Sequence, residues 1–235
     1  MPEPGSQPRR VRDAAGARTA ILNAAEVVFA EHGFDGARID TIAAEAGYNK
    51  SLIFQYFGDK LTLYAEVLTR ADREARELRA RVFAPLLEDE AIASNAHQLR
   101  AFFETAFQAV FDHLLAHPRL LRILLWEMAE GWQTYARISA QFQIEHVEQL
   151  ELLFQKAQRA GLIRSTFVPV IQLTMALQIC QSYLACLPLF QMLLTEDLSS
   201  SAALARARAY IVGLVVAGIM VDPRTPAAQT ERSLV

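Results

Sequence analysis

Apolar residues recur along most of this chain at the three- and four-residue spacing of helices, and no long stretch alternates them with polar residues as a strand would. The clearest apolar stripe lies between residues 14 and 32 and consists of Ile21, Ala24, Ala25, Val28 and Phe29. Its i, i+3, i+4, i+7, i+8 spacing places these side chains on one face of a helix. The pattern therefore predicts an all-α protein.

Glycines separate the predicted helices in the first third of the chain. These helices span Ala14–His32, Ile39–Ala46, Lys50–Phe57 and Lys60 to about Phe83. Gly33, Gly47 and Gly58 are expected to end the first three, because glycine readily adopts the positive φ found at helix C-termini. Asn49 and Asp59 precede the third and fourth helices, where a short polar side chain can cap the first turn.

The rest of the chain is larger and more apolar. Its predicted helices span roughly Ser94–Ala116, Pro118–Glu130, Trp132–Ala160, Val168–Leu194 and Ser201–Met220. Pro118 stands at a helix start, and Gly161 follows a long amphipathic stretch as a C-cap. Pro188 is expected to kink or shorten the fourth of these helices, because proline lacks the N–H of the helical hydrogen bond.

Composition indicates a globular protein. Hydrophobic residues make up 52% of the 235 positions and charged residues 21%, which excludes a disordered chain. The two cysteines, Cys180 and Cys186, make no disulfide framework, as is typical of a reducing cytoplasm. Residues 1–8 lack the apolar run of a signal peptide, and the longest apolar run, Ile211 to Val221, is too short to span a bilayer. We therefore expect a cytoplasmic protein with no membrane role.

Charge adds little about the partner. The net charge of −3 does not by itself point to nucleic acid. The N-terminal residues form a locally basic arm with Arg9, Arg10, Arg12 and Arg18 against Glu3 and Asp13. Such an arm can lie along phosphates, and a solvated tail is the alternative.

The stretch from Ile39 to Lys60 predicts a helix-turn-helix, because two short helices follow one another across a glycine turn. Alanines let the two helices approach closely, and Gly47 permits the sharp turn with a positive φ. We expect the inward-facing side chains of the second helix and of its neighbours to form one core, made by Ile53, Phe57, Ile21, Phe29 and Ile42. On spacing alone, a tight helical hairpin in an ordinary α-helical domain is the alternative.

The second helix would then present an outer face to the major groove of DNA. This face and its N-terminal end carry Tyr48, Asn49, Lys50, Gln55 and Tyr56. Gln55 is the predicted base reader, because an amide can donate to and accept from an adenine edge at once. Lys50 and Lys60 suit phosphate or a guanine acceptor, and Tyr56 suits phosphate.

A resemblance to a known family rests on this same motif. Residues 42–60 read IAAEAGYNKSLIFQYFGDK, which resembles the TetR-family pattern I-A-x-x-A-G-V-S-K-G-T-L-Y-x-Y-F-x-S-K. Phe29 to Phe34 is similar to the F-x-x-x-G-[FY] ending of that family's first helix. The resemblance is strong over about residues 15–75 and is only compatible with the sequence beyond them.

The resemblance implies a homeodomain-like DNA-binding domain followed by a helical ligand-binding and dimerisation domain. The implied divisions are a flexible basic arm 1–14, a DNA-binding domain 15–75, a C-terminal domain 76–221 and a flexible tail 222–235. The implied DNA-binding residues are Arg38, Thr41, Tyr48, Asn49, Lys50, Leu52, Phe54, Gln55, Tyr56 and Lys60. No cofactor, metal or catalytic residue is implied.

The chain departs from the family pattern at three positions. Arg38 stands where the family usually has a capping Thr or Ser, so the cap must come from elsewhere, with Asp35 as the candidate. Phe54 replaces a Tyr or Trp and cannot donate a hydrogen bond, which leaves contact with a thymine methyl or packing. Ser51 stands where the family has Gly or another small residue.

The resemblance also implies a homodimer, and the last two helices support it. Ala205, Ala209, Gly213 and Ala217 form a small-residue face that would let another helix approach closely. The preceding helix is apolar on more than one side, with Leu173, Met175, Leu177, Ile179 and Leu184. We expect these helices to pair with their symmetry mates in a four-helix bundle, and burial within one subunit is the alternative.

The implied effector pocket would use side chains that combine apolar bulk with a polar group. The candidates are Phe107, His113, Trp126, Trp132, Tyr135, Gln178 and Tyr183, and ordinary core packing is the alternative for each. His113 and His117 lie at i, i+4, but no third metal ligand is apparent. An α-helical enzyme is the rival class, yet Glu127 and Glu130 have no obvious base or nucleophile partner. A helical protein-binding module is a third reading.

The predicted mechanism is repression by a ligand-responsive dimer. Two recognition helices would occupy successive major grooves, about 34–36 Å apart, on a palindromic double-stranded operator. A small apolar or amphipathic effector bound between the C-terminal helices would act through the long helix that begins at Lys60 and change the separation of the two DNA-binding domains. A coupling of about 1–3 kcal/mol would weaken DNA binding roughly 5- to 150-fold. Activation is the alternative to repression.

Overall fold

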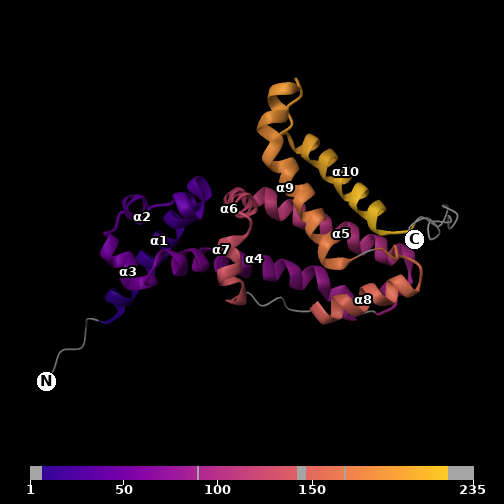
Figure 1. Ribbon diagram of the computed structural model, residues 1–235, viewed down its shortest axis with the longest axis horizontal. Coiled ribbons are helices and arrows are strands. Elements are labelled where there is room, and N and C mark those ends of the chain that lie inside the picture. Colours follow the sequence, from indigo (N-terminus) through magenta and orange to yellow (C-terminus); the bar gives the residue numbers. More distant parts are fainter. Residues whose placement is uncertain (1–6, 89, 142–146, 167, 222–235) are drawn as a thin grey trace, which may run out of the picture. The chain divides into compact units, whose positions relative to one another are not determined.

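The chain is helical throughout the part that the structure describes, which is residues 7–88, 90–141, 147–166 and 168–221 of a computed structural model (Figure 1). The described residues contain no strand, and their one isolated β-bridge joins Ile163 to Met220. The prediction of an all-α fold is confirmed. The predicted tail, 222–235, lies outside the described residues.

The chain forms two compact units, which we describe separately. The first unit contains residues 1–77 and 117–143, and the second contains residues 78–116 and 144–235. The first boundary between the units lies near residue 77, and the predicted domain division at 75 stays a prediction. Residues 117–143, however, pack with the first unit rather than with the rest of the predicted C-terminal domain.

The first unit surrounds a core contributed by helices far apart in the sequence. Its helices are α1 (Gln7–Gly36), α2 (Ile39–Ala46), α3 (Lys50–Phe57), the first part of α4 (Lys60–Glu88), α6 (Pro118–Ala129) and α7 (Gln133–Ile138). Their buried side chains include Ile21, Phe29, Ile42, Ile53, Phe57, Tyr64, Ile123 and Ile138. Helix α1 packs against both α2 and α6, so it links the helix-turn-helix to the later segment.

Helix α1 is longer than predicted at both ends. It begins at Gln7, so the predicted flexible arm is helical from that residue on, and residues 1–6 lie outside the described part. At its other end, Gly33 interrupts the helical backbone with φ 68° and ψ −178°. Only glycine adopts this combination readily, so Gly33 bends the chain as predicted, although Phe34 to Gly36 still follow as a last turn.

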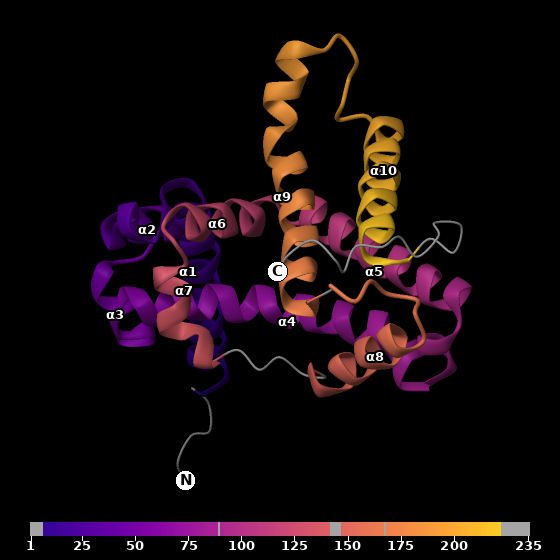
Figure 2. The ribbon, with the colours of Figure 1, turned by 45° about the vertical axis from the view of Figure 1, so that its right-hand side comes forward.

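The second unit consists of the end of α4 with α5 (Ala96–Ala116), α8 (Val147–Arg159), α9 (Pro169–Leu193) and α10 (Ser201–Ile219). Helix α5 packs against both α9 and α10, and a short 3₁₀ turn, Glu90–Ser94, contacts both α5 and α8. Buried rings of α5 form much of the core, with Phe103 stacked 6.1 Å from Phe154. Helices α9 and α10 run antiparallel and project beyond α5 (Figure 2).

One helix prediction for this part of the chain is wrong. The predicted helix Trp132–Ala160 is divided, because α7 ends at Ile138 and the 3₁₀ turn Ser139–Gln141 follows. The Ser139 hydroxyl donates to the Ala136 carbonyl, which offers the backbone a local alternative to helical bonding. Pro188 lies inside α9, whose bounds, Pro169–Leu193, are close to the predicted Val168–Leu194, so Pro188 does not shorten the helix; the alternative of a kink there stays a prediction.

Candidate nucleic-acid interface

The turn between α2 and α3 has the geometry that a helix-turn-helix needs. Gly47 adopts φ 72°, and its N–H donates to Ala44 while that of Tyr48 donates to Ala43. These two bonds satisfy carbonyls at the end of α2 and reverse the chain sharply. A Cβ atom at Gly47 would meet no atom within 4 Å, so the positive φ alone favours glycine here.

The caps of the next two helices are those that the sequence predicted. The Asn49 side chain accepts a hydrogen bond of 2.8 Å from the Leu52 N–H at the start of α3. The Asp59 carboxylate accepts one of 2.7 Å from the Thr62 N–H at the start of α4. This last bond, with further hydrogen bonds from Thr62 and Leu61, holds the pKa of Asp59 below its usual value. Both helices therefore begin at fixed residues.

Helix α3 is held by one face and exposes the other. Ile53 and Phe57 are buried in the same core as Ile21, Phe29 and Ile42, which confirms the predicted core set. The N-terminal end and outer face expose Tyr48, Asn49, Lys50, Ser51, Phe54 and Gln55. Leu52 and Tyr56 are half-buried and pack against the core. Tyr56 therefore lies less far out than the sequence suggested.

Lys50, the first residue of α3, has a charged partner within the unit. The Lys50 ammonium lies 3.1 Å from an Asp40 carboxylate oxygen, and both side chains are exposed. Such an exposed ion pair is weak, so a phosphate can replace the carboxylate at little cost. Lys50 is thus available to DNA, and Gln55 is exposed on the same helix.

Arg38 occupies the N-cap position of α2 and makes no capping hydrogen bond. The suggestion that Asp35 supplies the cap is wrong, since its side chain makes no hydrogen bond with any described residue. Its backbone carbonyl instead accepts a bond from Lys60. Arg38 and Thr41 are both exposed near the start of α2, as a phosphate contact requires.

Lys60 makes contacts within the first unit that the sequence did not predict. Its ammonium donates to the Asp35 carbonyl at 3.3 Å and lies 4.6 Å from the centre of the Phe34 ring. Burial lowers the pKa of Lys60, while the charges of Asp35 and Glu130 act in the opposite direction. Its assignment as a DNA contact stays a prediction, and the contacts seen here are those of a residue that joins α4 to the end of α1.

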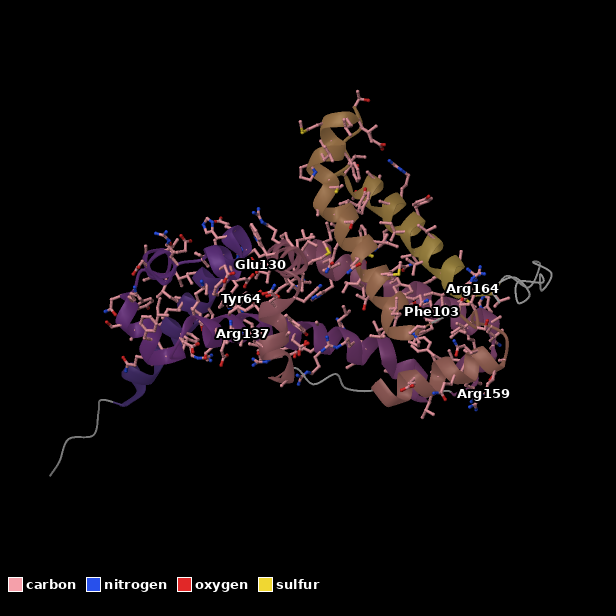
Figure 3. The ribbon with its side chains drawn as sticks, in the orientation of Figure 1. Tyr64, Phe103, Glu130, Arg137, Arg159 and Arg164 are labelled. Carbon is pink, nitrogen blue, oxygen red and sulfur yellow. The ribbon has the colours of Figure 1, made fainter. Side chains whose placement is uncertain are left out.

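Sequence reasoning missed a polar network that ties α6 and α7 to the DNA-binding helices. The Tyr64 hydroxyl of α4 donates to Glu127 at 2.5 Å, and the Tyr135 N–H donates to the same carboxylate at 3.0 Å. Glu127 is fully buried, so these bonds replace the water it has lost. The charge of Glu130 also acts on the Tyr64 hydroxyl, and both residues are labelled in Figure 3. A buried carboxylate 63 positions away from its tyrosine partner leaves no local signal in the sequence.

A second set of bonds attaches α6 to the end of α1. Arg122 Nε donates to the Ala30 carbonyl at 3.0 Å, and Trp126 Nε1 donates to it at 3.3 Å. Because Gly33 has no side chain, the end of α1 can approach α6 closely. A Cβ at this position would lie 3.0 Å from atoms of Trp126 and Glu130. Burial and the charges of Asp35 and Glu127 raise the pKa of Glu130.

The predicted effector contacts do not gather in one unit. Trp126, Trp132 and Tyr135 belong to the first unit, where Trp126 already contacts α1 and the other two rings meet edge to face at 5.9 Å. The second unit holds Phe107, His113, Gln178 and Tyr183. Their role as ligand contacts stays a prediction.

Within the second unit, these four side chains lie on two helices that pack together. Phe107 is buried on α5 and stacks 6.1 Å from Phe103, whereas Tyr183 on α9 lies 6.1 Å from Phe111. Burial raises the pKa of Tyr183. Among the described residues, His113 belongs to no group of three or more His, Cys, Asp or Glu side chains that could hold a metal ion.

Two family models match the chain in succession. Residues 21–67 match the model described as bacterial regulatory proteins of the tetR family. Residues 100–215 match the model described as the tetracyclin repressor-like C-terminal domain. Together the two models account for the helix-turn-helix and for most of the helices that follow α4.

Similar curated proteins carry repressor names. The chain is 39% identical over 119 residues to the HTH-type transcriptional repressor SCO4008 of Streptomyces coelicolor, a match that covers 51% of this chain and 53% of that protein. It thus spans only about half the length of this relative. It is 28% identical to the HTH-type transcriptional repressor NicS of Pseudomonas putida over 89% of this chain and 95% of that protein.

Solved structures have the same fold. The structure of SCO4942 from Streptomyces coelicolor matches with a TM-score of 0.56 at 29% identity, over 89% of this chain and 99% of that one. That of HlyIIR, a hemolysin II transcriptional regulator, matches with a TM-score of 0.58 at 21% identity, over 89% of this chain and 99% of that one. The second likeness concerns the fold alone.

Proposed function

We propose a function from one premise: the chain belongs to the TetR family of bacterial transcriptional regulators. It is therefore a DNA-binding regulator with a helix-turn-helix, and not an enzyme. Beyond this class, we propose that the protein represses transcription as a homodimer on a palindromic operator and that a small effector releases it.

The observation that carries the DNA-binding part of this proposal is the division of α3 into two faces. Ile53 and Phe57 are buried, while Lys50, Phe54 and Gln55 stand exposed on the other side. A helix held in this way can enter a major groove of about 12 Å without disturbing its own core. Gln55 would read a base, and Lys50, Arg38 and the N–H groups at the start of α3 would hold phosphates.

The test is an electrophoretic mobility shift with DNA from upstream of the gene, measured at several salt concentrations. We expect sequence-specific binding whose logarithm falls linearly with the logarithm of salt concentration. Replacing Lys50 with Ala should reduce that slope by about 1, because one phosphate contact is lost. Lys156→Ala on α8 is the matched control and should leave the slope unchanged. The absence of any sequence-specific shift would reject the proposal.

The dimer part of the proposal is supported by the apolar surface of α9 and α10. Ala205, Ala209, Gly213 and Ala217 of the small-residue face all remain exposed in the single chain, and so does Leu214 beside them. On α9, large exposed apolar side chains lie in both halves of the helix and include Ile171, Met175, Ile179, Leu189 and Met192. A second copy would cover both surfaces and form a four-helix bundle.

The main support for an effector response is that the chain belongs to this family. Helix α4 is one continuous helix of 29 residues that contributes to both compact units. A ligand that favours one position of α4 would change how well the helix-turn-helix fits DNA. A coupling of about 1–3 kcal/mol between the two sites would suffice.

We propose a cytoplasmic location, although α9 and α10 are long and apolar enough to cross a bilayer by length and composition alone. Their most apolar 18-residue windows have mean hydropathies of 1.4 and 1.6. One face of each helix is buried within the second unit, through Ala176 and Leu184 on α9 and Val215 and Val216 on α10. A partner copy accounts for the other face without a membrane.

A further inference from the structure

A hollow of about 300 Å³ lies inside the first unit, between α1, α4 and α6. It contains none of the seven side chains that the sequence suggested as effector contacts. Its volume is at the lower end of the range for small-molecule sites, so it suits a molecule built on a single ring. It lies within the unit that carries the helix-turn-helix.

One side of the hollow is polar and is held in place by hydrogen bonds. The Arg70 guanidinium of α4 donates to the Asn23 side-chain oxygen of α1 at 2.7 Å and also to Oε2 of Glu26, with which it forms an ion pair. Arg70 is therefore occupied and its charge is balanced. Within the described part of the chain, Glu26 Oε1 and Asn23 Nδ2 make no hydrogen bond, so one acceptor and one donor remain available in the hollow.

Most of the remaining lining of the hollow is apolar. Val67 and Leu68 of α4 and Ile123 of α6 are buried, Leu120 and Ala71 also line the hollow, and His117 at the start of α6 is the remaining polar member. Apolar walls with a few fixed polar groups are typical of small-molecule sites, in which the walls give affinity and the polar groups give orientation. The two sides together define which chemical class would fit.

We infer that this hollow is a binding site for a small neutral alcohol or phenol. A hydroxyl group both donates and accepts, so it can donate to Glu26 Oε1 and accept from Asn23 Nδ2 at once. A carboxylate cannot donate to Glu26 Oε1, and an ammonium cannot accept from Asn23 Nδ2, so each would leave one of these two groups without a hydrogen bond. The ring or alkyl body of the ligand would cover Val67, Leu68 and Leu120.

The test is calorimetric titration of the full-length protein, without DNA, using three probes of similar size: benzyl alcohol, sodium benzoate and toluene. We expect saturable binding of one benzyl alcohol per chain, with benzoate and toluene at least about tenfold weaker, since each lacks a hydrogen bond to the polar side. The absence of saturable benzyl alcohol binding would overturn the site, and equal or tighter binding of benzoate would overturn the assigned class.

Variants decide whether the hollow is the place where the alcohol binds. Ala71→Leu should fill it and abolish binding, and Asn23→Ala should weaken binding about tenfold by removing one hydrogen bond. Asn23 is exposed, so this second variant keeps the test valid if Ala71→Leu does not fold. Glu66→Gln is the matched control, because it breaks the other ion pair between α1 and α4, Arg18 with Glu66 at 2.9 Å, outside the hollow.

Binding that is unchanged in Asn23→Ala and in folded Ala71→Leu, or equally weakened by Glu66→Gln, would reject the location. The inference stands apart from the proposed function because no DNA is present in the titration. If the protein binds benzyl alcohol but gives no mobility shift, the binding site is supported and the proposed function is rejected. If it gives a specific mobility shift but does not bind benzyl alcohol, the proposed function is supported and the binding site is rejected.

Discussion

At the scale of single residues, α3 shows how two kinds of prediction differ in strength. The burial of Ile53 and Phe57 follows from their four-residue spacing in a short helix, and it is confirmed. Tyr56 was assigned to the outer face from the same helical geometry, yet it is half-buried against the core. An eight-residue helix has few positions that are wholly inside or outside, so the side chains at the border between its faces depend on tertiary packing.

Gln55 provides the sharpest residue-scale prediction about DNA. Because its amide is exposed and would contact one base pair, Gln55→Ala should lower affinity for the best operator by about 1–3 kcal/mol and relax the preference at that base pair only. The measurement is a binding competition against operators mutated one base pair at a time. Gln133→Ala, an exposed glutamine on α7, is the control and should leave the preferences intact. Equal loss across all sequences would show that Gln55 is not a reader.

The buried Tyr64 hydroxyl provides a prediction about stability. Burial and the Glu127 carboxylate raise the pKa of Tyr64 far above its usual value, so the hydroxyl stays a donor at every physiological pH. Tyr64→Phe would leave the fully buried Glu127 with one partner fewer and should cost about 1.5–3 kcal/mol of unfolding free energy. Urea denaturation measures this. A Tyr48→Phe control removes an exposed hydroxyl and should cost less than about 0.5 kcal/mol.

Glu130 provides a prediction about pH. Burial, with the charges of Asp35 and Glu127, raises its pKa above the usual 4.5, so the folded protein holds this proton more tightly than the unfolded chain. Its contribution to stability is complete below pH 4.5 and is lost as the pH rises through the raised value. The stability of the wild type relative to Glu130→Gln should therefore fall over that range in urea titrations.

One control corrects for charge. Glu45→Gln removes an exposed carboxylate of α2 and corrects for the change of net charge. A stability difference between wild type and Glu130→Gln that stays constant or rises with pH would contradict the assignment of the raised pKa.

At the scale of elements, local signals predicted best where a capping residue or a glycine marks the end of a helix. Helices α2 and α3 have the predicted bounds, Ile39–Ala46 and Lys50–Phe57. Gly47 ends α2, and Asn49 and Gly58 mark the two ends of α3, whereas the start of α2 has no side-chain cap. The division between α7 and α8 was missed, since the apolar spacing continues through it and no glycine or proline marks it. Where no glycine, proline or capping residue lies inside a long helical pattern, the sequence does not show that the helix is interrupted.

The bend in α1 provides a prediction at this scale. Gly33 has a backbone conformation that is nearly restricted to glycine, and a Cβ there would lie 3.0 Å from atoms of Trp126 and Glu130. Gly33→Ala should therefore strain the backbone and also push α6 away from α1, at a cost of about 3 kcal/mol or more. Gly47→Ala is the matched control, with a positive φ but open space, and should cost about 1–2 kcal/mol. Equal costs in thermal denaturation would contradict the role of α6.

At the scale of the whole molecule, the sequence predicted two functional parts but not how the chain divides between them. The segment 117–143 belongs to the compact unit of the DNA-binding helices because Glu127, Arg122 and Trp126 bond to residues of α4 and α1. Residues so far apart in the chain share no periodicity or spacing from which their contact could be predicted. The hollow beside Arg70 escaped prediction for the same reason, since three separate helices form it.

Assembly provides the last prediction. Leu214 is half exposed on α10 among the small residues that a second copy would cover, so Leu214→Glu should place an unpaired carboxylate in the dimer interface. We expect dimer dissociation to become at least about thirtyfold easier, which corresponds to roughly 2 kcal/mol, with a matching loss of operator affinity. Sedimentation equilibrium measures the first effect and mobility shift the second. Leu152→Glu, an exposed leucine on α8, should change neither. A Leu214→Glu protein that remains as dimeric as the wild type would place the interface elsewhere.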